Sequence, residues 1–379
     1  MIMRAIFLYN PAVVQFDYGT AHPFRLERIW LTEHLCRRLG LFEGTDREVR
    51  DFPQATREDL LVAHDSIYLD VLEAVSMGVH TPTLFVHGLG SGDNPVFPGL
   101  WDYALFTVGG TLEAARLIAD GTTARVFHPG GGLHHALRKR ASGFCYVNDV
   151  VVGISHLLEQ GKRVFYFDID AHHGDGVEQA FYENPRVFTF SMHQDGRTLF
   201  PGSGFVNEVG RGEGTGFAAN APLLPYMADG TYLRVWDEVV EPLIRAYRPD
   251  VLVTELGADA LQGDPLASLG LHLPAWWTIL KRIEALGIPW LAVGGGGYDL
   301  ANAMRAWTLA WGAMIGWVPK NGLPPKASEL PGAAREMRWP EDFWSAPVPA
   351  AGAPTDDEAT EMLVRQLRQQ LFPNHGLTP

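Results

Sequence analysis

The segment VFYFDIDAHHGDG, residues 164–176, joins four apolar residues directly to a dense group of aspartates and histidines. Its apolar half suits a buried β-strand, but several buried charges without partners would cost more free energy than a domain gains on folding. A bound cation would pair these charges. Asp170 and His172 are two residues apart, so an extended backbone turns both side chains to the same side. We therefore interpret this strand end as part of a metal site.

Asp259, in the segment GAD, could supply a third ligand from another strand end. Two carboxylates and one imidazole would give Zn²⁺ a neutral ligand set with one position open for water, which is typical of a catalytic site. The ion would lower the pKa of that water to about 7 and polarise a bound carbonyl group. A lone DxH pattern is more often a solvated turn, but Asp259 and the neighbouring histidines favour the metal site.

His134 and His135 follow three glycines, which permit a close approach of the backbone. Asp168 and Asp175 are not needed for the metal and could accept hydrogen bonds from the Nδ1–H groups of these histidines. Such carboxylates fix the tautomer and leave Nε2 facing the reaction centre, where it can act as a general base and later as an acid. Two core histidines bonded to backbone carbonyls are the alternative interpretation.

Three aromatic residues are candidates for the reacting and binding surfaces. Tyr298 follows four glycines, a loop that makes sense where backbone approaches a ligand, and its hydroxyl could donate to an oxyanion. Packing of a turn is the alternative for Tyr298. Phe144 and Phe200 could form the apolar walls of a narrow channel, or they could equally belong to the core.

The composition narrows the classes of partner and the compartment. A formal net charge of −14 argues against nucleic acid or an anionic membrane as the main partner. No apolar run reaches the roughly 20 residues that span a bilayer, and the N-terminus lacks the features of a signal peptide. Cys36 and Cys145 cannot build a disulfide framework or a thiolate zinc cluster. We expect a cytoplasmic protein.

Short apolar runs alternate with longer helical patterns along the chain. Strands are predicted at residues 5–9, 124–128, 163–169, 186–191, 251–256 and 289–293. Helices are predicted at residues 23–39, 57–77, 101–119, 148–159, 231–246, 274–286 and 300–315. This alternation predicts an α/β fold in one domain, with a doubly wound, mostly parallel sheet flanked by helices. Ligands then bind outside the carboxyl ends of the strands, where the polar clusters lie.

The C-terminal part has a different composition. Residues 317–354 are rich in proline, and the following TDDE is a capping box ahead of a last helix. We therefore divide the chain into a catalytic domain at 1–316 and an extension at 317–379, which ends in a helix packed on the same domain.

Six motifs occur in the same order as in the zinc-dependent histone deacetylase family, which this sequence therefore resembles. They are HPGGGLHHA, ASGFCYVND, DIDAHHGDG, FPGSG, GADALQGDPL and GGGGY. AHPFRLERI and GDNPVFPG are most similar to its bacterial branch, the acetoin utilisation proteins and histone deacetylase-like amidohydrolases. The resemblance extends from about residue 18 to 316. It implies an arginase/deacetylase type of fold and hydrolysis of N-acetyl amides, with acetylated protein lysine or a small acetylated amine as substrate.

The resemblance also implies the ions. Asp170, His172 and Asp259 match the Zn²⁺ ligands, with Fe²⁺ as an alternative in the cell. The family binds K⁺ as well. A first, structural K⁺ site would comprise Asp168, Asp170, His172, Ser191 and Met192. A second would comprise the carbonyls of Phe181, Asn184, Val187 and Phe217.

The same resemblance implies a role for each catalytic candidate. His135, paired with Asp175, matches the general base. His134, paired with Asp168, matches its electrostatic and acid partner. Tyr298 matches the residue that polarises the amide carbonyl.

The substrate-binding group implied by the resemblance comprises Asp93, Phe144, Phe200, Gly296 and Leu266. Phe144 and Phe200 match the walls around a lysine stem, and Asp93 matches a rim aspartate that binds the substrate backbone. Arg28 matches an arginine in an internal pocket through which acetate leaves. Leu266 stands where acetylpolyamine-selective relatives carry a glutamate, which removes the main reason to expect polyamine selectivity.

Three alternatives remain open on the sequence. A ureohydrolase with two manganese ions is disfavoured, because Gly174 and Leu261 stand where its second metal needs acids. A non-catalytic module that binds acyl-lysine is disfavoured by the intact catalytic candidates. A deacetylase of small amines shares the mechanism and is not separated from a protein deacetylase; the physiological substrate, acyl-chain preference and oligomeric state stay open.

Overall fold

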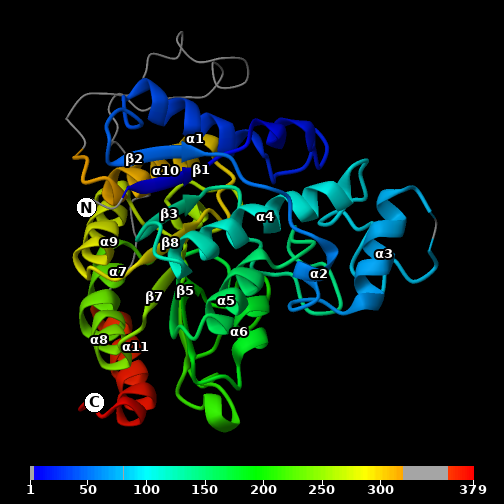
Figure 1. Ribbon diagram of the computed structural model, residues 1–379. Helices are drawn as coiled ribbons and strands as arrows, with labels where there is room; N and C mark the ends of the chain where they lie inside the picture. Colours follow the sequence, from blue (N-terminus) through cyan, green and yellow to red (C-terminus); the bar gives the residue numbers. More distant parts are fainter. Residues whose placement is uncertain (1–3, 80, 319–356) are drawn as a thin grey trace.

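A parallel sheet runs through the middle of the molecule. The structure, a computed structural model, describes residues 4–79, 81–318 and 357–379 of the chain (Figure 1). Within these residues the strands form a sheet in the order β2-β1-β3-β8-β7-β4-β5-β6, and neighbouring strands are parallel. The strands are β1 (Ala5–Leu8), β2 (Arg47–Arg50), β3 (Arg125–His128), β4 (Val164–Asp168), β5 (Val187–Gln194), β6 (Ala218–Leu223), β7 (Val251–Glu255) and β8 (Trp290–Val293). The predicted sheet is confirmed.

The central strands are apolar and buried because helices cover both faces of the sheet. Every residue of β4, which reads VFYFD, and of β7, which reads VLVTE, is buried. A sheet covered in this way selects near-continuous apolar runs, and such runs can be recognised in the sequence. The sequence does not predict β2 or β6. β2 reads REVR and is half-buried at one edge, and β6 reads AANAPL, which lacks β-branched residues.

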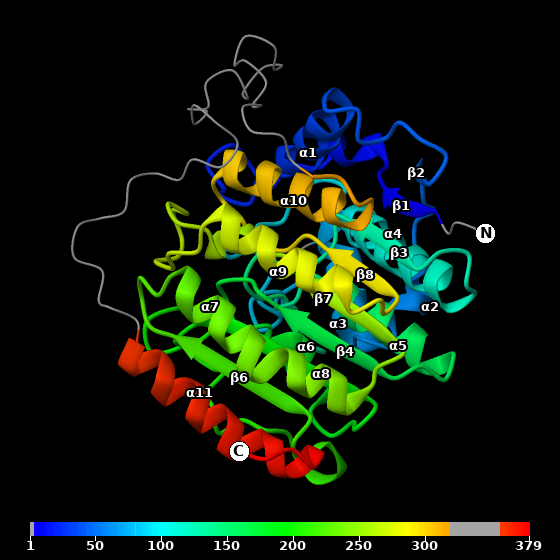
Figure 2. The ribbon, with the colours of Figure 1, turned by 90° about the vertical axis from the view of Figure 1, so that its left-hand side faces the viewer.

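Helices form a layer on each face of the sheet. In Figure 2, α7, α8, α9 and α10 lie in front of the strands, whereas α4, α5 and α6 lie behind them. The helices are α1 (Glu27–Arg38), α2 (Arg57–Leu60), α3 (Ser66–Ser76), α4 (Leu100–Ala119), α5 (Asp149–Glu159), α6 (Asp175–Phe181), α7 (Asp229–Val235), α8 (Glu241–Tyr247), α9 (Leu273–Ala285), α10 (Leu300–Met314) and α11 (Asp357–Leu371).

Some helices differ from the predicted ones. The pattern at 57–77 predicts one helix, but the structure has α2 and α3. Asp65 begins α3, because its backbone is extended and its side chain accepts a hydrogen bond from Ile67 N. The pattern at 231–246 predicts a regular helix, whereas a π-helical turn, Trp236–Val240, joins α7 to α8. Helix α6 is not predicted, since its seven residues directly follow the polar segment at 168–174.

The last helix, α11, packs on α7 and β6. Thr360 Oγ1 lies 2.8 Å from Thr231 Oγ1, and Leu363 and Leu367 of α11 are buried. Most of the predicted extension, residues 319–356, lies outside the described residues, so the division at residue 316 stays a prediction. In the described ranges, every helix is too short or too polar to span a membrane.

Candidate active site

The candidate site lies at the carboxyl edge of the sheet, where the loops after β3, β4, β5, β7 and β8 meet. β4 lies between β5 and β7, so that its last residue, Asp168, is the register partner of both Ser191 and Glu255. The loop after β3 carries the histidine pair, the segment after β7 carries Asp259, and the loop after β8 carries Tyr298. Residues far apart in the sequence therefore converge where parallel sheets bind their ligands.

The three predicted metal ligands lie together. His172 Nδ1 is 2.9 Å from Asp259 Oδ2 and 3.2 Å from Asp170 Oδ1, and all three residues are buried. One ligand atom from each residue lies within 4.8 Å of the others. Burial lowers the pKa of His172, but the two carboxylates outweigh burial and raise that pKa to about 10. Two buried carboxylates beside one imidazole need positive charge, and this donor set fits a divalent cation such as Zn²⁺ or Fe²⁺.

Two glycines leave the space that the ligand carboxylates occupy. A Cβ on Gly257 would lie 1.9 Å from Asp170 Oδ2, and a Cβ on Gly296 would lie 2.1 Å from Asp259 Oδ2. Gly296 N also donates a hydrogen bond of 2.6 Å to Asp170 Oδ2. Gly296 is predicted to bind substrate, and the structure places it directly against both ligand carboxylates.

The two histidines form the predicted pairs with aspartates. His134 Nδ1 lies 3.0 Å from Asp168 Oδ2, and His135 Nδ1 lies 2.8 Å from Asp175 Oδ1. Tyr166 Oη donates a further hydrogen bond of 2.7 Å to Asp168 Oδ2. The two Nε2 atoms approach each other to 3.0 Å. Because Nδ1 of each ring is held by a carboxylate, both Nε2 atoms are left for acid–base chemistry.

The two histidine rings have opposite electrostatic environments. Burial lowers the pKa of His134, but the carboxylates of Asp168, Asp170 and Glu255 outweigh burial and hold that pKa well above its usual value. Burial, reinforced by the charge of His134, lowers the pKa of His135 to about 4. The carboxylates around His134 thus favour its charged form, whereas the surroundings of His135 favour its neutral form.

Tyr298 ends the glycine-rich loop after β8. Gly295 N donates to Gly131 O at 3.1 Å, which ties this loop to the loop that precedes the histidine pair. The Tyr298 ring lies 6.3 Å from the His172 ring, centroid to centroid. Burial raises the pKa of Tyr298 well above its usual value, and nearby carboxylates add to the shift. The phenol therefore stays protonated and can donate a hydrogen bond.

The two predicted wall residues lie on either side of this centre. Phe144 packs against Tyr298, with ring centroids 5.7 Å apart, and Phe200 packs against His135 at 5.0 Å. Phe200 is 43% exposed, so it borders the solvent and does not belong to the core. Both rings thus contact catalytic candidates, and their grip on a lysine stem stays a prediction.

The predicted rim residues lie further out. Asp93 is exposed, and its backbone O lies 3.2 Å from Nε2 of His22, whose ring packs on Phe144. Leu266 is half-buried, and no carboxylate stands at its position. Asp93 is thus open to solvent, and its binding of a substrate backbone stays a prediction.

Arg28 lies on the inner side of the glycine-rich loop. Its Nη1 donates to Gly297 O at 2.9 Å, and its guanidinium stacks over Phe24 at 4.1 Å. Arg28 Nε has no hydrogen-bond partner among the described residues. This buried N–H is free to bind an anion such as acetate, and its role in acetate release stays a prediction.

The residues of the predicted K⁺ sites fall into two groups. The register of Asp168 with Ser191 joins the first set across β4 and β5. The second set lies at the start of β5 and β6, away from the catalytic edge, where Thr189 N donates to Phe217 O at 2.9 Å. The first set comprises Asp168, Asp170, His172, Ser191 and Met192, and the second comprises Phe181, Asn184, Val187 and Phe217. Binding of K⁺ at either place stays a prediction.

Two residues at the start of α5 hold the backbone around the histidine pair. Asn148 Nδ2 donates to His134 O and Ala136 O, both at 3.1 Å. Asp149 accepts hydrogen bonds of 3.0 and 2.8 Å from the backbone N–H groups of residues 132 and 133. Sequence reasoning gives these residues no role, although the motif ASGFCYVND contains both. Asn and Asp are common at the first residues of a helix, so the adjacent Asn148 and Asp149 are the signal that could have indicated this role.

Glu255, the last residue of β7, is a further buried acid that sequence reasoning does not single out. Its carboxylate is inaccessible and has no hydrogen-bond partner among the described residues. Its Oε1 lies 3.8 Å from His134 Nδ1. Burial raises the pKa of Glu255 well above its usual value, against the opposing effect of His134. Glu255 therefore adds negative potential around His134 when ionised.

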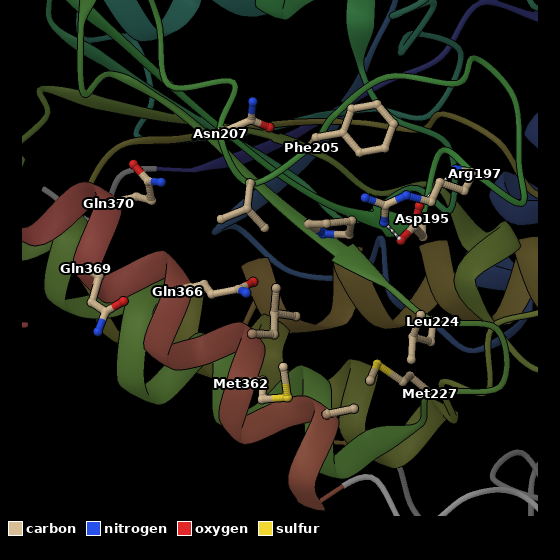
Figure 3. Close-up of a pocket in the computed structure, with 14 residues that line it drawn as sticks. Asp195, Arg197, Phe205, Asn207, Leu224, Met227, Met362, Gln366, Gln369 and Gln370 are labelled. Carbon is tan, nitrogen blue, oxygen red and sulfur yellow. Dashed lines mark hydrogen bonds and ion pairs between the residues drawn. The ribbon is translucent and has the colours of Figure 1, made fainter.

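A separate pocket lies between α11 and the strand end of β5 and β6 (Figure 3). Its volume is about 750 Å³. Met362 and Gln366 of α11 line one side, and Phe205 and Leu224 line the other. The lining residues include no predicted site residue, so this pocket is distinct from the candidate active site.

A ligand set for one divalent cation beside an acid and a base, at the carboxyl edge of a parallel sheet, is the arrangement of a metal-dependent hydrolase. The histone deacetylase domain family matches residues 22–314 of the chain. The chain belongs to the histone deacetylase family and is a deacetylase. This family is metal-dependent.

Individual relatives agree with this assignment. The acetoin utilization protein AcuC of Bacillus subtilis (strain 168) is 37% identical over 330 residues, covering 85% of each protein. Histone deacetylase RPD3 of Saccharomyces cerevisiae is 36% identical over 326 residues, covering 85% of this chain and 74% of that protein. A crystal structure of an HDAC homolog complexed with SAHA has a TM-score of 0.85 at 29% identity, covering 96% of this chain and all of that one. The predicted family, fold type and enzyme class are confirmed.

Proposed function

We propose that this deacetylase hydrolyses Nε-acetyl-lysine in proteins to free lysine and acetate. The observation that carries the proposal is geometric: His134 and His135 are buried beside the metal-ligand set, a carboxylate holds Nδ1 of each ring, and the two Nε2 atoms lie 3.0 Å apart. An amide hydrolase needs a base for water and an acid for the leaving amine, and these two rings meet both needs. The similarity to proteins called histone deacetylases supports a protein substrate.

Three residues of the chain act on water and on the carbonyl. His135 accepts the proton of the attacking water at Nε2, while Asp175 holds its Nδ1–H. The Tyr298 phenol donates a hydrogen bond to the carbonyl oxygen, where negative charge develops. A divalent cation held by the ligand set, for which we propose Zn²⁺ with Fe²⁺ as the alternative, would supply Lewis-acid chemistry at this point.

His134 completes the reaction. The bond between water oxygen and the carbonyl carbon has formed, and the carbon–nitrogen bond must break. His134 Nε2 donates its proton to the leaving nitrogen, while Asp168 holds the opposite side of the ring at 3.0 Å. The carbon–nitrogen bond breaks to give acetic acid and the amine, and the proton lost when the acid ionises to acetate converts the amine to its ammonium form. Transfer of the proton held by His135 to His134, between Nε2 atoms 3.0 Å apart, restores both rings.

The apolar side chains around the catalytic residues favour a substrate whose entering part is the uncharged aliphatic stem of an acetylated lysine. Phe144 and Phe200 flank the catalytic residues with apolar faces, and Leu266 at the rim has no charge that would attract a polyamine. Small acetylated amines share the reaction and are the second candidate substrates. We also propose structural K⁺ at the first predicted site and a cytoplasmic location.

Turnover with and without a chelator tests the proposal. The Zn²⁺-loaded protein is given an acetyl-lysine peptide or acetylated polyamines, and released acetate is measured. We expect release from the peptide that stops with chelator and in His135→Ala. Release from the polyamines alone would move the function to small amines, and release from neither would contradict the proposal.

A further inference from the structure

Asp264 is a buried carboxylate that the predicted mechanism does not use. It lies five residues after Asp259, on the segment between β7 and α9, and is 7% exposed. Its Oδ2 accepts hydrogen bonds from Tyr298 N at 2.8 Å and from Asp299 N at 3.3 Å. Its Oδ1 accepts a hydrogen bond of 2.9 Å from Leu266 N, which fixes the orientation of the carboxylate.

The loop that carries Tyr298 needs such an anchor. The four glycines at 294–297 have no side chains to pack, and two of them, Gly295 and Gly297, have positive φ values of 104° and 128°. A glycine-rich segment loses much conformational entropy when it becomes ordered, so its position depends on hydrogen bonds. Hydrogen bonds at Gly295, Gly296 and Gly297 hold the loop up to the residue before Tyr298.

The bond to Asp264 acts on the backbone of Tyr298 itself. The phenol oxygen is at the far end of the side chain, so a small rotation of the backbone moves this oxygen further than it moves Cα. Displacement of a reacting group by about 1 Å can cost about 100-fold in rate. Burial, reinforced by the charge of Asp259, raises the pKa of Asp264 to about 7, and the three backbone N–H donors oppose that shift. The ionised carboxylate accepts stronger hydrogen bonds from N–H groups than the neutral acid does.

We propose that Asp264 is a positioning residue, which places the Tyr298 hydroxyl by binding the backbone N–H groups at 298 and 299. This inference rests on the proposed function of Tyr298. The hydrogen bonds of Asp264 go to the backbone N–H groups of residues 298, 299 and 266, so we expect it to act on catalysis through Tyr298. Its loss should therefore lower the catalytic rate only while the hydroxyl of Tyr298 is present.

A double-mutant cycle tests this dependence. Asp264→Asn keeps the size of the side chain. Its NH₂ group, however, must face either the N–H groups of residues 298 and 299 or that of residue 266, and that hydrogen bond is then lost. We expect kcat on an acetyl-lysine peptide to fall about 10-fold to 100-fold, with KM changed much less. In the Tyr298→Phe background, the same substitution should change kcat by less than about twofold, because coupled residues are not additive.

Two further variants serve as a control and as a replacement for Asp264→Asn. Asp250→Asn is the matched control, since Asp250 Oδ2 accepts a hydrogen bond of 2.7 Å from Arg163 N at the opposite edge of the sheet. It should leave kcat unchanged. Asp264→Ser, which removes the charge without adding opposing N–H groups, replaces Asp264→Asn in the cycle if that variant does not fold. Metal content is measured for every variant.

The outcomes separate this inference from the proposed function. Equal falls of kcat in both backgrounds, or no fall in Asp264→Asn, would overturn the positioning role and leave the proposed reaction intact. An unchanged kcat in Tyr298→Phe alone would overturn the role of Tyr298 and the inference with it. A loss of bound metal in Asp264→Asn that accounts for the whole fall would also overturn it.

Discussion

Replacing Gly257 by alanine tests whether the space left by this glycine is needed for the Asp170 carboxylate to stand in the ligand set. Gly257 has φ −58° and ψ 122°, a conformation that alanine adopts without strain. The added Cβ would lie 1.9 Å from Asp170 Oδ2 and 2.4 Å from Asp170 Cγ. Non-bonded heavy atoms prefer a separation of about 3.5 Å, so the carboxylate must retreat by more than about 1 Å.

A displacement of more than about 1 Å is large enough to break a coordination bond between the carboxylate and the metal. Zinc–oxygen bonds are about 2.0–2.2 Å long, so the Asp170 carboxylate would lose its place in the ligand set. Disturbing the groups that merely support ligands costs about 10-fold to 100-fold in metal affinity. We expect at least the upper end here, about 100-fold, which corresponds to about 2.7 kcal/mol of binding free energy.

The assay is competition for Zn²⁺ against a chromophoric chelator, together with metal content after dialysis. Gly230→Ala is the matched control, because a Cβ on Gly230 meets no atom within 4 Å. The control should bind Zn²⁺ as the unmodified protein does. If Gly257→Ala bound Zn²⁺ with unchanged affinity, the steric explanation of this glycine would be refuted.

Three further predictions follow from the site and its surroundings. Tyr298→Phe should lower kcat by about 100-fold to 1,000-fold in a peptide deacetylation assay, because it removes one donor to the developing oxyanion; a fall under about threefold would contradict this. Burial lowers the pKa of His64 to about 4, so below pH 6.5 the unfolded chain binds more protons at this residue than the folded chain does. The free energy of unfolding, measured in urea, should therefore decrease by about 2 kcal/mol when the pH is lowered from 7 to 5. His64→Gln should remove that part of the pH dependence, and an equally steep loss in this variant would show that other groups cause it. Leu266→Glu should raise kcat/KM for acetylated polyamines relative to an acetyl-lysine peptide, and an unchanged ratio would argue against a role of residue 266 in selectivity.

The metal and histidine candidates could be predicted because their signals are short and local. Asp170 and His172 follow an apolar strand directly, and the strand itself is one of the near-continuous runs that parallel sheets select. The pairing of His134 with Asp168 required only that two strand ends meet. In the structure, both groups lie at the same edge of the sheet, and their roles stay predictions.

Other features depend on neighbours that the sequence does not order in space. Glu255 lies beside His134 because β7 and β4 pair in register, and no local pattern distinguishes it from an exposed acid. Asp264 looks like an ordinary turn residue until the loop at 294–299 is placed against it. The edge strand β2 is charged and the short α6 is polar at its start, so neither has the apolar signal of a buried element.

The strand order has a consequence for synthesis of the protein. Among the described residues, β8 is the last strand along the sequence, yet it lies in the interior of the sheet between β3 and β7 (Figure 1). Without β8, this strand order leaves two separate half-sheets, β2-β1-β3 and β7-β4-β5-β6, each with an open edge. Contacts between residues so distant in sequence form slowly and expose strand edges meanwhile. A nascent chain that ends before residue 290 should therefore depend on chaperones, and synthesis of β8 should allow the halves to join and the catalytic edge to assemble.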